Sequence, residues 1–170
     1  MANLLRERLE AAQAATAESN RRAERIVWTS VLANAGLGAV PFGVNVLTFV
    51  AANVTMVAAL GHVYGYTTTR EQAGALIRQI LSTVGVTWAV GAIGAKLFAE
   101  IIKVAGIATL GAATVAGVAF DAVLSGTLSY ALGYTAITYF KAGSSLGRKE
   151  MRETFRASLT EARAKIRKAP

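Results

Sequence analysis

The chain contains 170 residues, of which 54% are hydrophobic and 16% are charged, and its formal net charge is +8. This length fits one domain, and the charged fraction is below the value of about 25% that is typical of soluble domains. The chain has no cysteine, which excludes disulfides and thiolate metal sites, and its one histidine, His62, argues against a metal cluster. We therefore expect neither a metal nor another cofactor.

The first 25 residues mix acidic and basic side chains and are expected to form a charged helix. They contain no apolar region followed by a small-residue cleavage site, so we expect no signal peptide. Residues at the a and d spacing of a heptad predict one seam along this helix and into the next segment. The seam consists of Leu5, Leu9, Ala12, Thr16, Ser19, Ala23, Ile26, Ser30, Ala33 and Leu37. Its small residues make a weak coiled coil. The C-terminal helix has a stripe of its own, formed by Met151, Phe155, Ser158, Leu159, Ala162 and Ile166. Because neither stripe is strongly apolar, we expect the two ends to pack on each other or on the body rather than on partners.

Residues 26–69 form an uncharged run of 44 positions, which is long enough for two membrane-spanning helices of about 20 residues each. Pro41 removes a backbone donor and disfavours helical geometry at the residue before it, and Gly38 and Gly43 add backbone freedom. Residues 38–45 are therefore predicted to bend the chain between two antiparallel helices. A phosphate-binding loop is excluded here, because the stretch lacks the Lys-Ser/Thr ending and follows no strand.

The helix after this turn is predicted to carry polar and small side chains along one face at three-four spacing. Such a face permits close helix approach and hydrogen bonds between helices. His62 is expected to be an interface histidine rather than a ligand or base. With two residues from the later apolar region, the predicted polar seam consists of Asn45, Thr48, Asn53, Thr55, His62, Asp121 and Ser125.

Residues 70–103 are mixed, and Leu76, Ile77, Ile80, Leu81 and Val84 recur at helical spacing. Residues 104–140 are again apolar, and their one charge is Asp121. In the middle of a bilayer this carboxylate would oppose insertion by roughly 2.5–3.5 kcal/mol. We therefore expect it to face the bundle interior, against Thr114, Ser125 or a neighbouring helix, either as a structural carboxyl or as part of a relay or ion site. No strand pattern persists along the chain.

The C-terminal region carries most of the net charge, because residues 141–170 hold nine Lys/Arg and three Glu, a balance of +6. A basic flank beside an apolar region is typical of the cytoplasmic side of a membrane. Nucleic-acid binding is disfavoured, because no aromatic residues alternate with the bases as a stacking platform. The predicted basic surface consists of Arg148, Lys149, Arg152, Arg156, Arg163, Lys165, Arg167 and Lys168.

Two stretches resemble a widespread bacterial domain of unknown function, "VPFGVNVLTFVAANVTMVAALGHVYGYT" and "TVAGVAFDAVLSGTLSYALGYTAITYFKAG". The resemblance rests on Pro41-Phe42, Tyr64-Gly65, the run 129–133 and Tyr139-Phe140. That domain occurs after Era-like small GTPase domains and in YcjF-like inner-membrane proteins. The resemblance implies membrane association, a body of helical hairpins and a GTPase-type partner, and it offers no catalytic residues. These 170 residues contain no GTPase domain, so we expect the GTPase to be a separate chain. The stretch "AGIATLGAATV" lacks the proline of the family's second turn.

The sequence thus predicts an all-α protein, in which helical hairpins form a membrane-associated multi-helix bundle with amphipathic charged terminal helices. The expected divisions are a charged helix at 1–25, an apolar domain at 26–142 and a basic amphipathic helix at 143–170. The principal apolar segments are expected at 26–40, 44–66, 79–95 and 107–140.

We expect a non-enzymatic oligomeric scaffold or anchor in the bacterial inner membrane, with cytoplasmic termini, acting in membrane remodelling or the stress response. Its expected partners are lipids, further copies of the chain and a separate GTPase, but no nucleic acid. One alternative is an ion channel or transporter-like oligomer with Asp121, Asn53 and His62 along a polar path. The other is a soluble self-assembling shell or cage protein.

Overall fold

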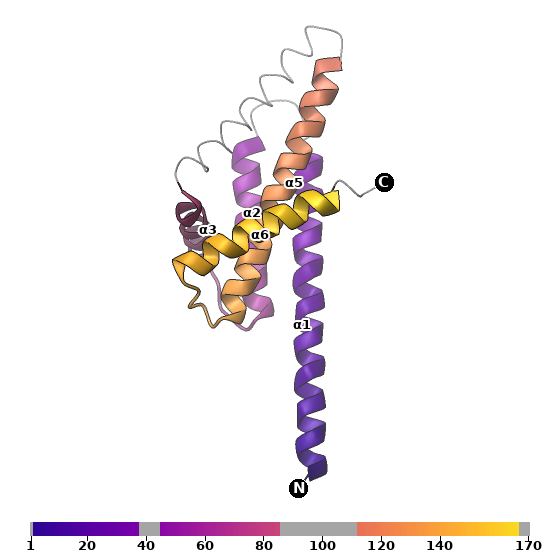
Figure 1. Cartoon of the computed structure of the whole chain (residues 1–170), viewed down its shortest axis with the longest axis vertical. Helices are drawn as coiled ribbons and strands as arrows, with labels where there is room; N and C mark the ends of the chain where they lie inside the picture. The colour runs from indigo at the N-terminus through magenta and orange to yellow at the C-terminus, as the bar shows by residue number, and fades with distance from the viewer. Residues whose placement is uncertain (1, 38–44, 86–111, 167–170) are drawn as a thin grey trace.

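The computed structural model describes residues 2–37, 45–85 and 112–166, and these residues form five helices and no strand (Figure 1). The helices are α1 (Ala2–Leu37), α2 (Asn45–Val63), α3 (Arg70–Val84), α5 (Ala112–Lys141) and α6 (Arg148–Ile166). The prediction of an all-α protein is therefore confirmed for the described part of the chain.

Helix α5 lies at the centre of the bundle and packs against α1, α2, α3 and α6. From Ser125 to Ile137 every residue is buried except Tyr134, which is half-buried. This stretch is built from apolar, small and hydroxyl-bearing residues, and no charged residue marks a solvent side. A helix without a polar face is stable in water only when other helices enclose it. The other described helices supply that enclosure.

Helices α1 and α2 run in opposite directions along α5 (Figure 1). Val27 and Val31 of α1 and Met56, Val57 and Leu60 of α2 belong to one buried core with α5. The opposite directions are those expected for a hairpin. The predicted turn residues, Gly38, Pro41 and Gly43, lie outside the described residues.

Helix α3 begins at a capping box on Thr69. The Thr69 hydroxyl accepts a hydrogen bond from the Gln72 backbone N–H at 3.2 Å, and the Gln72 side chain accepts one from the Thr69 N–H at 2.9 Å. Two backbone donors at the helix start are thereby satisfied. The predicted apolar stripe is confirmed for Leu76, Ile77, Ile80 and Val84, which are buried against the rest of the bundle. Its fifth member, Leu81, is half-buried.

Helix α6 crosses α5 and α1 obliquely (Figure 1). Its apolar stripe is buried in the core, and the members described are Met151, Phe155, Ser158, Leu159 and Ala162. At its start the backbone N–H of Gly147 donates to the Glu150 carboxylate at 3.0 Å. The expectation that this helix packs on the body is therefore confirmed.

The N-terminal helix is also expected to pack on the C-terminal helix or on the body, but the first half of α1 does neither. Residues 8–17 are all exposed, and this part of α1 extends past the ends of α2 and α5 to a distant N-terminus (Figure 1). Contact with the body begins near Asn20, whose side-chain oxygen accepts a hydrogen bond from the Tyr64 hydroxyl at 3.2 Å. The predicted boundary between residues 25 and 26 falls inside this continuous helix of 36 residues.

Within the described ranges, no helix combines the length and the apolarity needed to cross a membrane. The described parts of the apolar segments predicted at 26–40, 44–66, 79–95 and 107–140 therefore give no support to membrane-spanning helices.

Gly133 provides a test of this packing. A Cβ atom on Gly133 would lie 2.7 Å from Val27 Cγ2 and 3.2 Å from Met56 Sδ, so α1 and α2 approach α5 closely there. Valine is stiff in a helix, so it cannot move away freely. We expect Gly133→Ala to lower the free energy of unfolding by about 1–3 kcal/mol, measured by chemical denaturation.

The matched control is Gly36→Ala, because a Cβ atom at Gly36 of α1 meets no atom within 4 Å. This change removes a flexible residue from a helix and should be neutral or stabilising by about 0.5–1 kcal/mol. Equal effects of the two substitutions would contradict the close approach at Gly133.

Candidate interaction surfaces

The structure divides the predicted polar seam into buried and exposed members. Asn53, Asp121 and Ser125 are buried, and Thr48 is half-buried. Thr55 and His62 are exposed, and the Thr55 hydroxyl donates to the Ala51 carbonyl of its own helix at 3.0 Å. Asn45 is the first residue of α2, and its side chain lies outside the described set. The three-four spacing of α2 therefore does not correspond to one buried face.

Asp121 is fully buried in α5 and accepts a hydrogen bond from the Ser125 hydroxyl at 3.3 Å. Ser125 lies one turn later on the same helix, as the sequence allowed. The side chain of Thr114 lies outside the described residues. The observed contact agrees with a structural carboxyl and does not test a relay or an ion site.

A further buried polar pair was missed by the sequence analysis. The Asn34 side-chain amide of α1 donates to the Ser129 hydroxyl of α5 at 2.8 Å, and both residues are buried. The side-chain oxygens of Asn34 and Asn53 have no hydrogen-bond partner among the described residues. An asparagine inside an otherwise apolar run was the available signal. Such pairs fix how helices align, because sliding would leave buried polar atoms unpaired.

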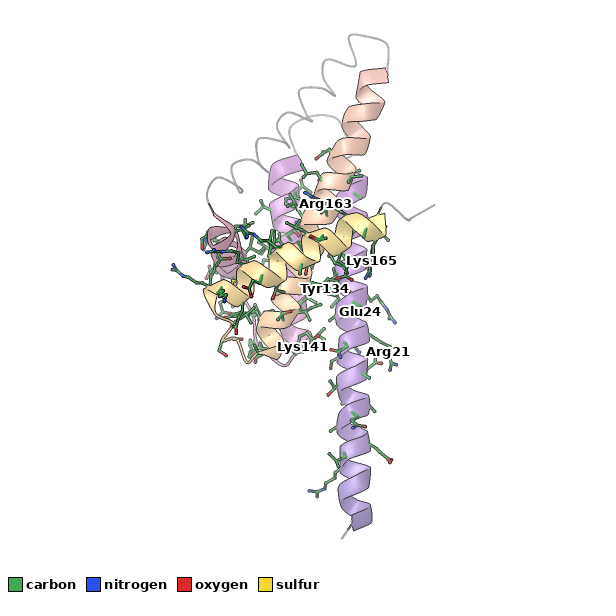
Figure 2. All side chains as sticks on the ribbon, viewed as in Figure 1. Arg21, Glu24, Tyr134, Lys141, Arg163 and Lys165 are labelled. Atoms are coloured by element: carbon green, nitrogen blue, oxygen red, sulfur yellow. The ribbon has the colours of Figure 1, made fainter. Side chains whose placement is uncertain are left out.

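Lys165 attaches the end of α6 to α5 and α1. Its ammonium donates to the Tyr130 hydroxyl of α5 at 2.9 Å and lies 2.7 Å from the Glu161 carboxylate. It also lies 5.3 Å from the centre of the Tyr130 ring and 6.0 Å from that of Trp28 of α1. Figure 2 shows Lys165 where α6 crosses α1. The sequence placed this residue on a basic surface, whereas the structure also gives it a packing role.

The ionisation of this cluster follows from its contacts. The hydrogen bond between Glu161 and Lys165 lowers the pKa of the Glu161 carboxyl and raises the pKa of the Lys165 ammonium. Burial raises the pKa of Tyr130, and the hydrogen bond from Lys165 acts in the opposite direction. The contribution of Glu161 to stability is lost as pH falls through its lowered pKa, and that of Lys165 as pH rises through its raised pKa. The pair is therefore intact at neutral pH.

The other described members of the predicted basic surface are exposed on α6. Arg152 donates to the Thr83 carbonyl of α3 at 2.6 Å, so it also holds α6 against α3. Lys149 lies 4.0 Å from Glu153, and both are highly exposed. The exposed basic residues of α6 are Arg148, Lys149, Arg152, Arg156, Arg163 and Lys165. Arg167 and Lys168 lie outside the described residues.

We call residues 8–20 of α1 the projecting segment. A shallow hollow of about 410 Å³ follows one face of it. Leu9, at one end of this hollow, exposes 63% of its surface. Near the other end, Glu18 accepts hydrogen bonds from Arg22 at 2.9 Å and Arg21 at 3.0 Å, and these bonds lower its pKa. The residues that line the hollow are Leu9, Ala12, Gln13, Thr16, Ala17 and Asn20.

No group of three or more His, Cys, Asp or Glu side chains suited to a metal ion occurs among the described residues. The features that stand out in this part of the chain are surfaces for contact: the projecting segment, the basic side of α6 and the grooves between helices.

Comparison with protein families gives a match that covers most of the chain, which is enough to assign the chain to the family. The model of the family described as "Domain of unknown function (DUF697)" matches residues 5–164. The chain belongs to this family. The match agrees with the resemblance to a domain of unknown function, while the association with Era-like GTPases and YcjF-like proteins stays an expectation. Comparisons with curated proteins and with solved structures give no match.

Replacing Lys165 tests its role in attaching α6. Lys165→Met keeps an unbranched side chain but removes the charge and the donor to Tyr130. We expect the free energy of unfolding to fall by about 1 kcal/mol, since exposure weakens each of these contacts. The melting temperature, followed by circular dichroism, should fall by about 2–4 °C.

Arg163→Met is the matched control, because Arg163 is exposed on the same helix. Its effect should lie within about 0.5 kcal/mol of zero. A loss at Arg163 as large as the loss at Lys165 would mean that general helix charge, rather than the Tyr130 contact, determines the result.

Proposed function

We propose that the protein is an oligomeric helical scaffold, in which the bundle is the body and the projecting segment of α1 joins two copies. The observation that carries this proposal is the continuous face of α1. Ala23, Val27 and Val31 on this face are buried in the bundle. The same face continues at helical spacing past Asn20, which bonds to Tyr64, to Thr16 and Leu9, where no described helix of this chain covers it (Figure 1).

The uncovered half of this face, on the projecting segment, is suited to packing against a second helix. A solvated helix of this length gains little stability from its own hydrogen bonds, and most helices in proteins depend on packing. Ala12, Thr16 and Ala17 are small and let another backbone approach closely, while Leu9 can fill the hollow of a partner. A second copy provides both features at once.

We further propose that two projecting segments pair antiparallel, in a symmetric dimer. In that arrangement each segment extends toward the other copy's body, and identical surfaces meet as a two-fold axis requires. A parallel pair would instead bring the two bodies side by side. The resemblance to a GTPase-associated family is the reason to place a separate GTPase among the proteins that such a scaffold serves.

Substitution of Leu9 tests the dimer contact. We expect Leu9→Glu to weaken self-association at least about tenfold, because one buried leucine contributes roughly 1.5–3 kcal/mol. The measurement is sedimentation of the full chain over a range of concentrations. Leu32→Glu is the matched control, since Leu32 lies on the same helix and exposes 68% of its surface, against 63% for Leu9.

The proposal fails if the parent chain is a monomer throughout, or if Leu32→Glu dissociates it and Leu9→Glu does not. The absence of native cysteine allows a second measurement of orientation. Single cysteines along the hollow should cross-link at only one central level in an antiparallel pair. Cross-linking at every level would indicate a parallel pair.

The basic side of α6 favours a second proposal, that the scaffold contacts anionic lipid headgroups. The apolar side of α6 is buried in the bundle, so this contact would be electrostatic and would not require a spanning helix. Placement at the bacterial inner membrane would then depend on Arg148, Lys149, Arg156 and Arg163.

Vesicle binding tests this second proposal. The parent chain should sediment with vesicles that contain anionic lipid and not with neutral ones, and binding should weaken as salt rises. Glu substitution of Arg156 and Arg163 should reduce binding at least about thirtyfold, at roughly 1 kcal/mol for each of the two positive charges removed. Equal binding to neutral vesicles would contradict an electrostatic contact.

A further inference from the structure

A second apolar surface, which no other described helix covers, lies between α2 and α3. It is a groove of about 420 Å³, which we call the α2–α3 groove. Val50, on its α2 side, exposes 49% of its surface, and Val54 and Leu81 are half-buried. Its lining residues are Val50 and Val54 of α2, with Arg70, Glu71, Gly74, Ile77, Arg78 and Leu81 of α3.

Gly74 keeps this groove open. A Cβ atom at this position would lie 3.9 Å from Val54 and 4.0 Å from Arg78, which are ordinary contact distances. The glycine therefore relieves no clash with the bundle, although a glycine inside a helix is less stable than an alanine. Its effect is to leave room between two apolar helix faces.

The charges at the groove are two arginines and one glutamate. Arg70 and Arg78 are separated by eight residues of α3, which corresponds to about 12 Å along a helix. Both are exposed, and no ion pair joins either one to an acidic side chain among the described residues. With Glu71 the balance at the groove is +1.

We propose that the α2–α3 groove binds an amphipathic helix of another protein, with an apolar stripe and acidic side chains beside it. The apolar lining fits the side chains that such a helix presents at positions i, i+3, i+4 and i+7. Its acidic residues would pair with Arg70 and Arg78. A large apolar side chain of the ligand would occupy the space beside Gly74.

A second copy of this chain is a poorer occupant on the same evidence. Face-to-face pairing of two α2–α3 grooves would bring the arginines of both copies together, which costs free energy. The projecting segment already has a proposed partner in its own hollow, and its charges are mixed in sign. Charge complementarity therefore favours an acidic helix from a different protein.

The probe for this test is a fluorescent synthetic helix of about 15 residues, with leucine along one stripe and glutamate along both flanks. Its matched twin carries lysine in place of every glutamate. We expect the glutamate helix to bind the full chain at least about tenfold more tightly than the lysine helix, by fluorescence anisotropy.

Two variants locate the binding to the groove. Gly74→Leu fills the space beside Val54 and should weaken binding at least about tenfold, whereas Gly74→Ala, the control, should leave binding within about twofold. Arg70→Glu combined with Arg78→Glu should reverse the preference toward the lysine helix. Circular dichroism confirms folding of each variant, and a glutamate at the start of α3 suits the helix dipole.

Three results would overturn the proposal. They are no binding of the glutamate helix, equal binding of the two helices, or binding that Gly74→Leu leaves unchanged. Binding to anionic vesicles is measured separately. If the parent chain binds no peptide, and the double arginine variant loses the vesicle binding that the parent shows, the groove would be assigned to lipid. Leu9→Glu leaves this groove intact, so failure here is distinguishable from failure of the proposed dimer.

Discussion

The enclosure of α5 is the constraint on which the rest of the structure depends. Its central residues are buried on every side, so it requires neighbours all around rather than along one stripe. Small residues decide how close those neighbours come, and at Gly133 the side chains of Val27 and Met56 occupy the place of a Cβ atom. The positions of α1 and α2 follow from this contact, and α6 then covers the remaining side.

Helix α5 lies in the core although it contains several serine and threonine residues, because most of their hydroxyl groups find hydrogen-bond partners. The Thr135 hydroxyl donates to the Ala131 carbonyl at 2.7 Å, and Thr138 bonds to Tyr134 in the same way at 3.0 Å. Each is satisfied within its own helix and needs no partner elsewhere. The longer side chains bond across helices or along α5, as Asn34 does with Ser129 and as Asp121 does with Ser125. The exceptions among the described residues are the side-chain oxygens of Asn34 and Asn53 and the Thr127 hydroxyl, which are buried without a hydrogen-bond partner.

The sequence predicted helix content and the buried stripes of α3 and α6, because charged residues mark the solvent side of both helices. It did not predict the environment of α2 and α5, where small and polar residues are suited equally to helix contacts in lipid and in a protein core. Thr55 and His62 show the same difficulty, since spacing placed them in a seam and the structure exposes them. The contacts of Lys165 with Tyr130 and Trp28 join residues that are 35 positions apart and more, and no local pattern encodes them.

The unbroken course of α1 has a mechanical consequence. With 36 residues it is about 54 Å long, and only its second half is held by the bundle. A rotation of about 10° of α1 about Asn20, where its contact with the body begins, would displace the free end by roughly 5 Å, since about 30 Å of helix lies before that point. Small changes in how α1 packs on α5 and α2 are thereby converted into larger movements at a distant tip.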